Sequence, residues 1–267
     1  MGRGASWRPL QFVLFVLLLS PAHGEELADL QARFGVITGD VGLLTQGAIE
    51  WIVPHEGLPI ETGDHIRTGE DGRAEVIMNG NVVWWLEPET DFETEHMEVN
   101  RGTFNLSSGT LLGIVDSGRT AGTVQDWLIN TPSASVTIQG TEFALEFSKA
   151  HGARLGVSAG IVEIEAAETA EGRQPPVRVM PAQEAIVARG HSIQISSKPS
   201  ARMREWTDGW PEIRRSFRQI QNTWSPFTPT TRAEARKKFV SAPQKRSKPK
   251  PHIPVRKTHK PPPQNSY

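Results

Sequence analysis

Three groups of residues in this chain could do chemistry: a serine between glycines, a scattered set of histidines, and a row of acids. The stretch 156–160 reads G-V-S-A-G and fits the G-x-S-x-G pattern of a nucleophilic serine by letter. That pattern needs a helix directly after the serine. Here Ile161, Glu163 and Glu165 alternate with apolar residues, which indicates a strand. We therefore expect Ser158 in a hairpin turn, without a nucleophilic role.

The histidines do not form a metal-binding pattern. No pair has the H-x-H, H-x-x-x-H or HExxH spacing, so a metal site would have to be assembled from distant parts of the fold. The chain has no cysteine, which excludes disulfides, thiol catalysis and zinc–thiolate sites. No phosphate loop or dinucleotide fingerprint is present. We expect no catalytic residue, no cofactor and no metal ion.

An acidic row follows the middle of the chain, with acids at every second position: Glu87, Glu89, Asp91, Glu93 and Glu95. In an extended strand these side chains lie on one face. One interpretation is a cation site or a docking strip for a basic partner. The other is a solvated outer face with Phe92 as its buried anchor. The second is favoured, because a calcium site needs acids that converge from a loop.

Short strands and tight turns must position these residues. Residues 58–83 contain turn signals at 62–64, 69–72 and 79–81, with a period-two strand at 73–78. Asn79-Gly80 is a strong hairpin signal, because both residues tolerate positive φ. Trp84 and Trp85 in the return strand face opposite ways. One belongs to the core, and the other is either a binding platform or, as we favour, covered by a helix at 211–224.

The same alternation continues to residue 195, interrupted by Gly, Pro and Asn. Two further short strands, 103–106 and 110–115, are expected around a turn at Ser107-Ser108-Gly109. Such regularly spaced strands predict an all-β solenoid, barrel or sandwich, and the spacing alone does not choose among them.

Four pieces of sequence, in order, resemble the FecR domain, which is named for the periplasmic regulator of ferric-citrate uptake. They are a Gly-Asp pair followed by Ile-x-Thr-Gly at 63–69, a hairpin at 79–81, Gly-Thr-x-Phe at 140–143, and Val-x-x-Gly-x-Val at 157–162. The likeness covers roughly 34–195. The residues that carry it are expected to be structural: Gly63, Asp64, Thr68, Gly69, Gly80, Gly140, Thr141, Phe143 and Gly160.

The resemblance implies a solenoid-like stack of short strands, with a sandwich as the alternative. It also implies a domain that receives a signal by contact with another envelope protein. In regulators of this family an anti-sigma segment and a transmembrane helix precede the domain, and we expect neither here. The family name is no indication that this chain binds iron, since the sequence has no cluster of hard-oxygen or imidazole ligands.

The first residues predict where in the cell the protein is located. Arg3 and Arg8 precede an apolar run at 10–19, which Ser20 and Pro21 break before the small residue Gly24. The run is about half of the ~20 residues that span a bilayer, so we expect a signal peptide at 1–24, cut near Gly24, and a periplasmic protein.

Charge divides the rest of the chain. Residues 232–267 hold eleven Lys or Arg and one acid, whereas the remainder holds 18 basic and 29 acidic residues. We expect a β domain at 34–196, a helical segment at 203–226 and a disordered Lys/Arg/Pro-rich tail at 232–267. Two charge-segregated parts imply two tasks, or one part docking on the other.

The helix at 211–224 carries an apolar stripe with arginines beside it. It therefore packs on the β domain or lies on an anionic membrane, and the packing is favoured.

Two functions remain open from the sequence. The first is a non-enzymatic binding, sensing or scaffold module that contacts an envelope protein through its β domain. The alternative is an envelope-attachment protein whose basic tail binds peptidoglycan or lipopolysaccharide. A basic tail also suits nucleic acid, but the expected signal peptide argues against that partner.

Overall fold

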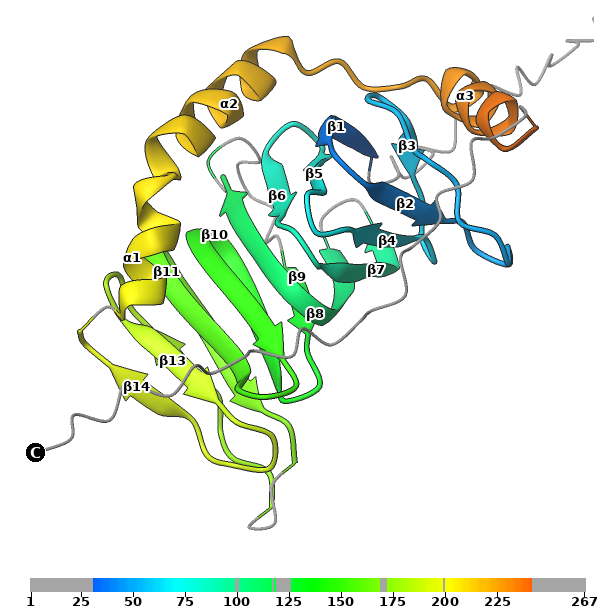
Figure 1. The fold of residues 1–267 in the computed structure, drawn as a ribbon. Helices are drawn as coiled ribbons and strands as arrows, with labels where there is room; N and C mark the ends of the chain where they lie inside the picture. Colours follow the sequence, from blue (N-terminus) through cyan, green and yellow to red (C-terminus); the bar gives the residue numbers. More distant parts are fainter. Residues whose placement is uncertain are drawn as a thin grey trace, which may run out of the picture.

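The computed structural model describes residues 31–98, 101–116, 118, 126–168, 172–198 and 200–241 of the 267-residue chain. Within them, fourteen strands form one sheet and three helices follow (Figure 1). The prediction of an all-β fold followed by a helix is confirmed. The expected signal peptide lies outside the described residues.

Most strands are short, whereas β8, β10 and β11 have 15 residues each. The first strands are β1 Ala32–Thr38, β2 Val41–Leu44, β3 Pro59–Ile60, β4 His65–Thr68, β5 Arg73–Met78, β6 Val82–Leu86 and β7 Asp91–Glu98. The others are β8 Arg101–Val115, β9 Asp126–Asn130, β10 Ala134–Ser148, β11 Gly152–Ala166, β12 Val177–Val179, β13 Glu184–Val187 and β14 Gln194–Ser196. The helices are α1 Ala201–Asp208, α2 Trp210–Thr223 and α3 Pro229–Ser241.

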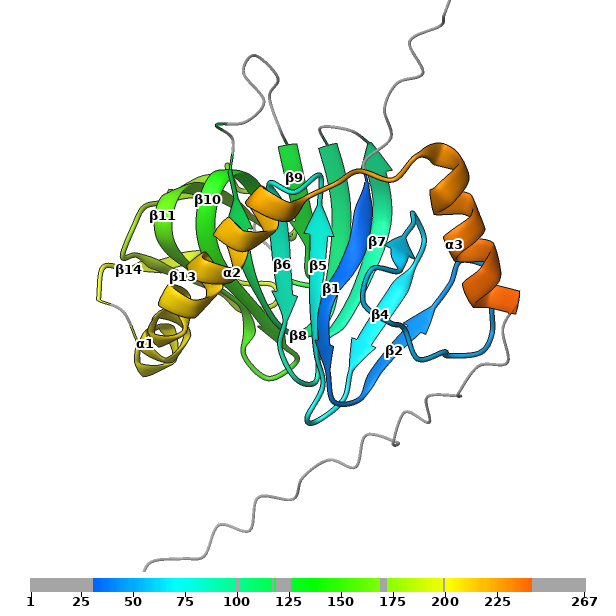
Figure 2. The ribbon, with the colours of Figure 1, turned by 90° about the horizontal axis from the view of Figure 1, so that it is seen from above.

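The long strands take different neighbours at their two ends. β8 pairs with β7 through residues 101–108 and with β6 through 111–115. β10 pairs with β9 through 135–138 and with β8 through 142–147. These strands therefore carry the sheet around a bend, and Figure 2 shows the resulting curvature.

The turn predicted at Ser107-Ser108-Gly109 is wrong, because these residues lie inside β8. Gly109 has a φ of +93°, and a Cβ there would lie 2.4 Å from the Cα of Thr90. The glycine lets the backbone change direction while the strand continues, so the sequence signal for a turn marks a bend instead.

One apolar core lies between the two halves of the bent sheet. Trp84 on β6 is fully buried and makes edge-to-face contacts with Phe143 on β10 and Trp127 on β9, with ring centroids 5.5 and 6.5 Å apart. Gly113 on β8 makes room for this cluster, because a Cβ would lie 2.4 Å from Phe143. The strands thus form one continuous sheet, as expected of a stack, and the two halves of this sheet enclose one core, as in a sandwich.

A second apolar cluster lies on the outer face of β5, β6, β8 and β10, where α1 and α2 cover it. The helix predicted at 211–224 is confirmed as α2, and its stripe packs on the sheet through Phe217, Ile213 and Ile220. Trp85 lies under the same helix, so the covered interpretation of this tryptophan is confirmed. Figure 2 shows α2 crossing the strands.

The expectation of a disordered tail from Arg232 is wrong for residues 232–241, which form most of α3. Phe239 is 7% exposed and belongs to the main core, so this segment has apolar surface to bury. Residues 242–267 lie outside the described residues. Within the part that the structure describes, the helices are too short or too polar to cross a membrane.

Candidate functional site

The predicted motif residues near the start of the sheet fix turns. Asn79 and Gly80 have φ values of 49° and 69° and connect β5 to β6, as the hairpin prediction requires. A Cβ on Gly80 would lie 2.4 Å from the ring of Trp224, so this glycine also lets the end of α2 pack down. Gly63 adopts a φ of +80° in the turn before β4.

Thr68 and Gly69 connect the end of β4 to neighbouring turns. The Thr68 hydroxyl donates to the Glu87 carbonyl at 2.6 Å and accepts the Thr90 N–H at 2.9 Å. The Gly69 N–H donates to the Asp40 carbonyl at 2.7 Å. These residues satisfy backbone groups at a turn, which is a structural role.

The second motif group lies where β10 and β11 bend together. Gly140 and Gly160 have φ values of +61° and +79°, and a Cβ on Gly160 would lie 2.5 Å from the Gly140 carbonyl oxygen. The register of the pair shifts here, which is the signature of a bulge. Thr141 is buried beside the bulge, and Phe143 lies in the core. The structure therefore places the motif residues in two structural clusters.

Asp64 is the exception, because it connects the motif to the C-terminal helix. It is fully buried, and its carboxylate accepts the Glu61 N–H at 2.9 Å and a hydrogen bond from Arg236 of α3. Arg236 is 9% exposed and also donates to the Pro59 carbonyl at 2.8 Å. Burial raises the pKa of Asp64, although the Arg236 guanidinium acts in the opposite direction.

These contacts place α3 over one edge of the sheet. β3 is the last strand in the strand order, next to β1. The guanidinium groups of Arg236 and Arg232 donate to the carbonyls of Pro59 and Ile60, the two residues of β3. Figure 2 shows α3 beside this side of the sheet. The described part of the basic segment, residues 232–241, thus docks on the acidic body at Arg236. Docking of one part on the other was one of the two outcomes that the charge division predicted.

Sequence reasoning missed this contact, yet a signal for it exists. Thr228 and Pro229 are favourable helix-start residues, and the Thr228 hydroxyl accepts the Thr231 N–H at 3.2 Å. Arg232, Arg236 and Phe239 follow at i, i+4 and i+7, which places them on one helix face. The high lysine and arginine content obscured this short pattern.

Acidic side chains on the sheet fasten α1 and α2. Glu142 accepts three hydrogen bonds from Arg214, two at 3.0 Å and one at 2.5 Å, and Glu146 accepts two from Arg202 at 3.2 and 2.8 Å. Glu75 is 4% exposed and accepts the hydroxyl of Ser216 at 3.1 Å; burial raises the pKa of Glu75. The helices are therefore held by polar contacts as well as by the apolar cluster.

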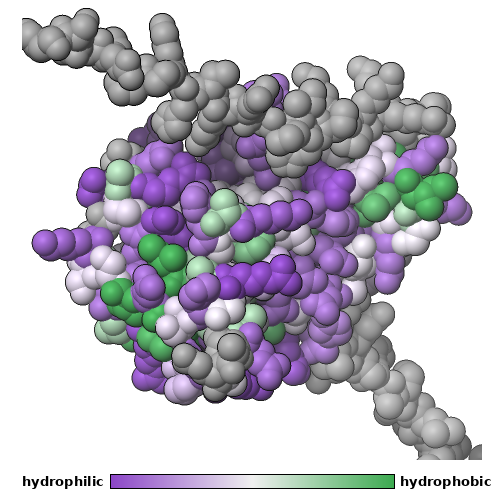
Figure 3. Space-filling model, turned by 60° about the horizontal axis from the view of Figure 1, so that its bottom comes forward, coloured by the Kyte–Doolittle hydropathy of each residue, from purple (hydrophilic) through white to green (hydrophobic). Residues whose placement is uncertain are grey.

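The opposite edge of the sheet has no such cover within the described residues. β14 ends the strand order and pairs with β13 on one side. Ile195 in its middle is 40% exposed. On the face of the molecule that Figure 3 draws, apolar side chains gather in separate areas with hydrophilic surface between them. An unpaired strand edge presents N–H and C=O groups to which another chain can add.

In the acidic row Glu89 and Glu95 are exposed, whereas Glu87, Asp91 and Glu93 have partners within the chain. Phe92 is fully buried, as the solvated-face interpretation predicts. Asp91 accepts hydrogen bonds from His65 and from Arg67, the latter at 2.6 Å. Burial opposes ionisation, but these two partners lower the pKa of Asp91. Among the described residues no group of three His, Asp or Glu side chains is placed to hold a metal ion.

Ser158 lies inside β11 and not in a turn, so that prediction is wrong. The strand runs through the bulge at Gly160 instead of reversing there. In the described part of the chain the Ser158 hydroxyl has no hydrogen-bond partner. A nucleophilic serine needs a base within hydrogen-bond reach, and the geometry of Ser158 supplies none.

The fold and these contacts define a class of protein: a bent, open β sheet around one core, whose C-terminal helices are fastened to its outer face and to one edge. The family model described as FecR protein matches residues 64–163, from the turn before β4 into β11. The resemblance seen in the motifs is confirmed over this range. α1, α2 and α3 lie outside it.

Two crystal structures of a candidate anti-sigma factor from Parabacteroides distasonis ATCC 8503 are similar to this chain. Each is 16% identical, with a TM-score of 0.44 and coverage of 54% of this chain. The match spans 65% of one of those chains and 64% of the other, slightly less than two thirds. No match is found among curated proteins.

Proposed function

We propose that this chain is a non-enzymatic binding module of the cell envelope that engages a protein partner through its β domain, in a sensing or scaffold role. The FecR match over residues 64–163 supports a regulatory module of this kind. The periplasmic address rests on the signal peptide expected at 1–24. Fractionation of cells and sequencing of the mature N-terminus test that address directly.

The observation that carries the proposal is the contrast between β3 and β14, the strands at the two ends of the main strand order. α3 occupies the carbonyls of β3 at one edge, whereas β14 at the other edge pairs on one side within the described residues. A partner strand adds to such an edge through main-chain hydrogen bonds, and side chains such as Ile195 supply selectivity. We infer that the partner binds along β14.

The test is capture of envelope proteins by the chain from residue 25, at low and high salt, with mass-spectrometric identification. Ile195→Lys places a charge in the middle of the edge, which natural strands use to prevent pairing. Ile49→Lys is the matched control, because Ile49 is 95% exposed and lies outside the named strands. We expect the chain to capture a protein partner that stays bound at high salt. The Ile195→Lys variant should lose this partner, and the Ile49→Lys variant should still capture it.

Other outcomes contradict the proposal. Equal capture by both variants would exclude the β14 edge as the binding site. Recovery of anionic envelope polymers alone, all released by salt, would favour attachment through the basic residues after 241 instead. Loss of those polymers on deletion of 242–267 would then identify the segment responsible.

A further inference from the structure

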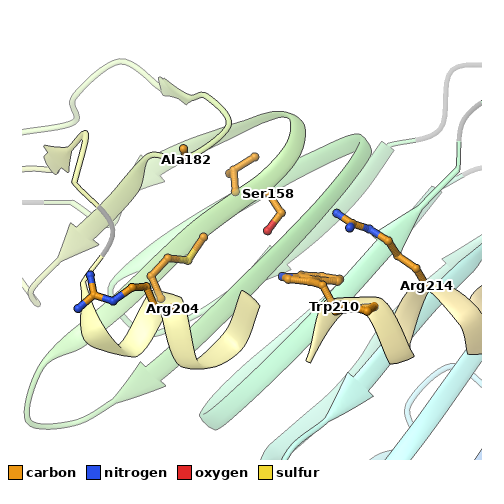
Figure 4. Close-up of a pocket in the computed structure, with 8 residues that line it drawn as sticks. Ser158, Ala182, Arg204, Trp210 and Arg214 are labelled. Carbon is orange, nitrogen blue, oxygen red and sulfur yellow. The ribbon is translucent and has the colours of Figure 1, made fainter. Parts of the chain in front are cut away.

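A cavity of about 350 Å³ lies between β11, the turn that joins β12 to β13, and the junction of α1 with α2. This volume is within the range of small-molecule sites, which is roughly 300–1,000 Å³. Figure 4 shows the side chains that surround it. They are Val157, Ser158, Ala182, Met203, Arg204, Trp210, Pro211 and Arg214. Nothing in the contacts described so far uses this space.

Two polar groups that line the cavity are buried without a partner. Trp210 is 2% exposed, and its indole nitrogen makes no hydrogen bond to any described residue. The hydroxyl of Ser158 is in the same situation. In Figure 4 the two side chains point toward one another, from the start of α2 and from β11. A buried polar group without a partner is costly, so a pair of them beside a cavity suggests a ligand that satisfies both.

Two of the apolar lining residues, Met203 and Ala182, are fixed in place by packing and by a backbone hydrogen bond. Met203 packs directly on the backbone of Gly156, where a Cβ would lie 1.9 Å from its sulfur. Ala182 has a φ of +62°, and its N–H donates to the Val157 carbonyl at 2.9 Å, which holds the turn against β11. A non-glycine residue in the left-handed region is strained, and such strain is found most often at functional sites.

The chemistry of the polar groups determines the kind of ligand. An indole N–H only donates, and a serine hydroxyl can donate as well as accept, so a ligand with acceptor oxygens suits both groups. The lining includes the cationic side chains of Arg204 and Arg214 and no acid. Arg214 is shared with Glu142, and its side chain is 46% exposed. An anionic acceptor with an apolar body fits this combination better than a neutral or cationic one.

We propose that this cavity binds a small apolar carboxylate. Its carboxylate accepts hydrogen bonds from the Trp210 indole and the Ser158 hydroxyl, and its hydrocarbon part lies against Val157 and Met203. The site is separate from the β14 edge and goes beyond the proposed function. It also gives the G-x-S-x-G serine a role as a binding group.

The test is calorimetric titration of the chain from residue 25 with three eight-carbon probes at pH 7: octanoate, octanol and octylamine. We expect saturable octanoate binding, about ten-fold tighter than octanol, with octylamine weakest, because one charge-assisted hydrogen bond corresponds to about ten-fold in affinity. Ser158→Ala and Trp210→Phe each remove one donor and should weaken octanoate about ten-fold. Both should affect octanol less.

Trp206→Phe is the matched control, since Trp206 is also a buried tryptophan of this helical segment but does not line the cavity. It should leave octanoate affinity unchanged. Equal affinity for the three probes, no saturable octanoate binding, or equal effects of Ser158→Ala and Trp206→Phe would each overturn the proposal. If Trp210→Phe fails to fold, as circular dichroism would show, Ser158→Ala decides alone. None of these outcomes depends on a protein partner at β14.

Discussion

Replacing Arg236 by methionine tests whether α3 is held on the sheet by a buried ion pair. Methionine keeps most of the apolar stem and removes the guanidinium, so Asp64 remains fully buried without its counter-charge. Removing one partner of a buried pair costs about 3–5 kcal/mol. Arg236 lies at the periphery of the core and is 9% exposed, so we expect the lower value, about 3 kcal/mol at neutral pH.

The loss should depend on pH in a defined direction. Burial already raises the pKa of Asp64 above its ordinary value of 3.8, so the native state binds a proton more readily than the unfolded state. The contribution of Asp64 to stability is therefore full below pH 3.8 and is lost as pH rises through its raised, native pKa. Without Arg236 that pKa rises further, and the penalty of Arg236→Met should be larger at pH 7.5 than at pH 4.5.

Urea unfolding at the two pH values measures the loss, and hydrogen exchange of the α3 amides shows whether the helix detaches first. Lys237→Met is the control, because Lys237 is the exposed neighbour of Arg236 on the same helix. It should change the free energy of unfolding by no more than about 0.5 kcal/mol. A loss of similar size for both variants, or a loss for Arg236→Met that is independent of pH, would refute the reasoning.

Three further tests, with five substitutions in all, examine other contacts. Glu75→Gln removes a buried carboxyl whose pKa is raised, so the fall of stability as pH rises toward neutrality should become shallower in pH-dependent urea unfolding. Gly80→Ala should lower the free energy of unfolding by about 2–3 kcal/mol, because the position has positive φ and the added Cβ would clash with Trp224. Its control is Gly47→Ala, where φ is also positive but the Cβ meets open space, so the loss should be about 1 kcal/mol. Trp84→Ala should cost about 3–5 kcal/mol and Trp85→Ala less, since the first is fully buried and the second is partly exposed; a reversed order in urea unfolding would contradict the assignment of their faces.

Local patterns in the sequence were sufficient for many of the strands, the Asn79-Gly80 hairpin and α2. Period-two alternation and an apolar helical stripe report which side chains are buried, and burial is the main determinant of these elements. The prediction failed at Gly109 and Gly160, where a glycine bends a strand instead of ending it. Positive φ is common to turns and bulges, so a glycine alone does not distinguish them.

The candidate sites were less accessible to sequence reasoning. The ion pair between Asp64 and Arg236 joins residues 172 positions apart. The local pattern of Arg232, Arg236 and Phe239 indicates a helix face, but it does not say which residue that face contacts. The cavity likewise needs Ser158 from β11 and Trp210 from α2 in one place. The G-x-S-x-G match pointed to Ser158 for the wrong reason, because the motif presupposes a helix that this fold does not have there.

The packing of α3 on β3 has a consequence for the protein during its synthesis and after proteolysis. Synthesis produces Pro59 long before Arg236. The edge at β3 therefore stays uncovered until almost the whole described chain has been synthesised. A product cut before residue 229 would retain all the strands, yet β3 would be uncovered as well as β14. Proteolytic trimming at the C-terminal side would thereby turn a self-contained protein into one prone to edge-to-edge aggregation.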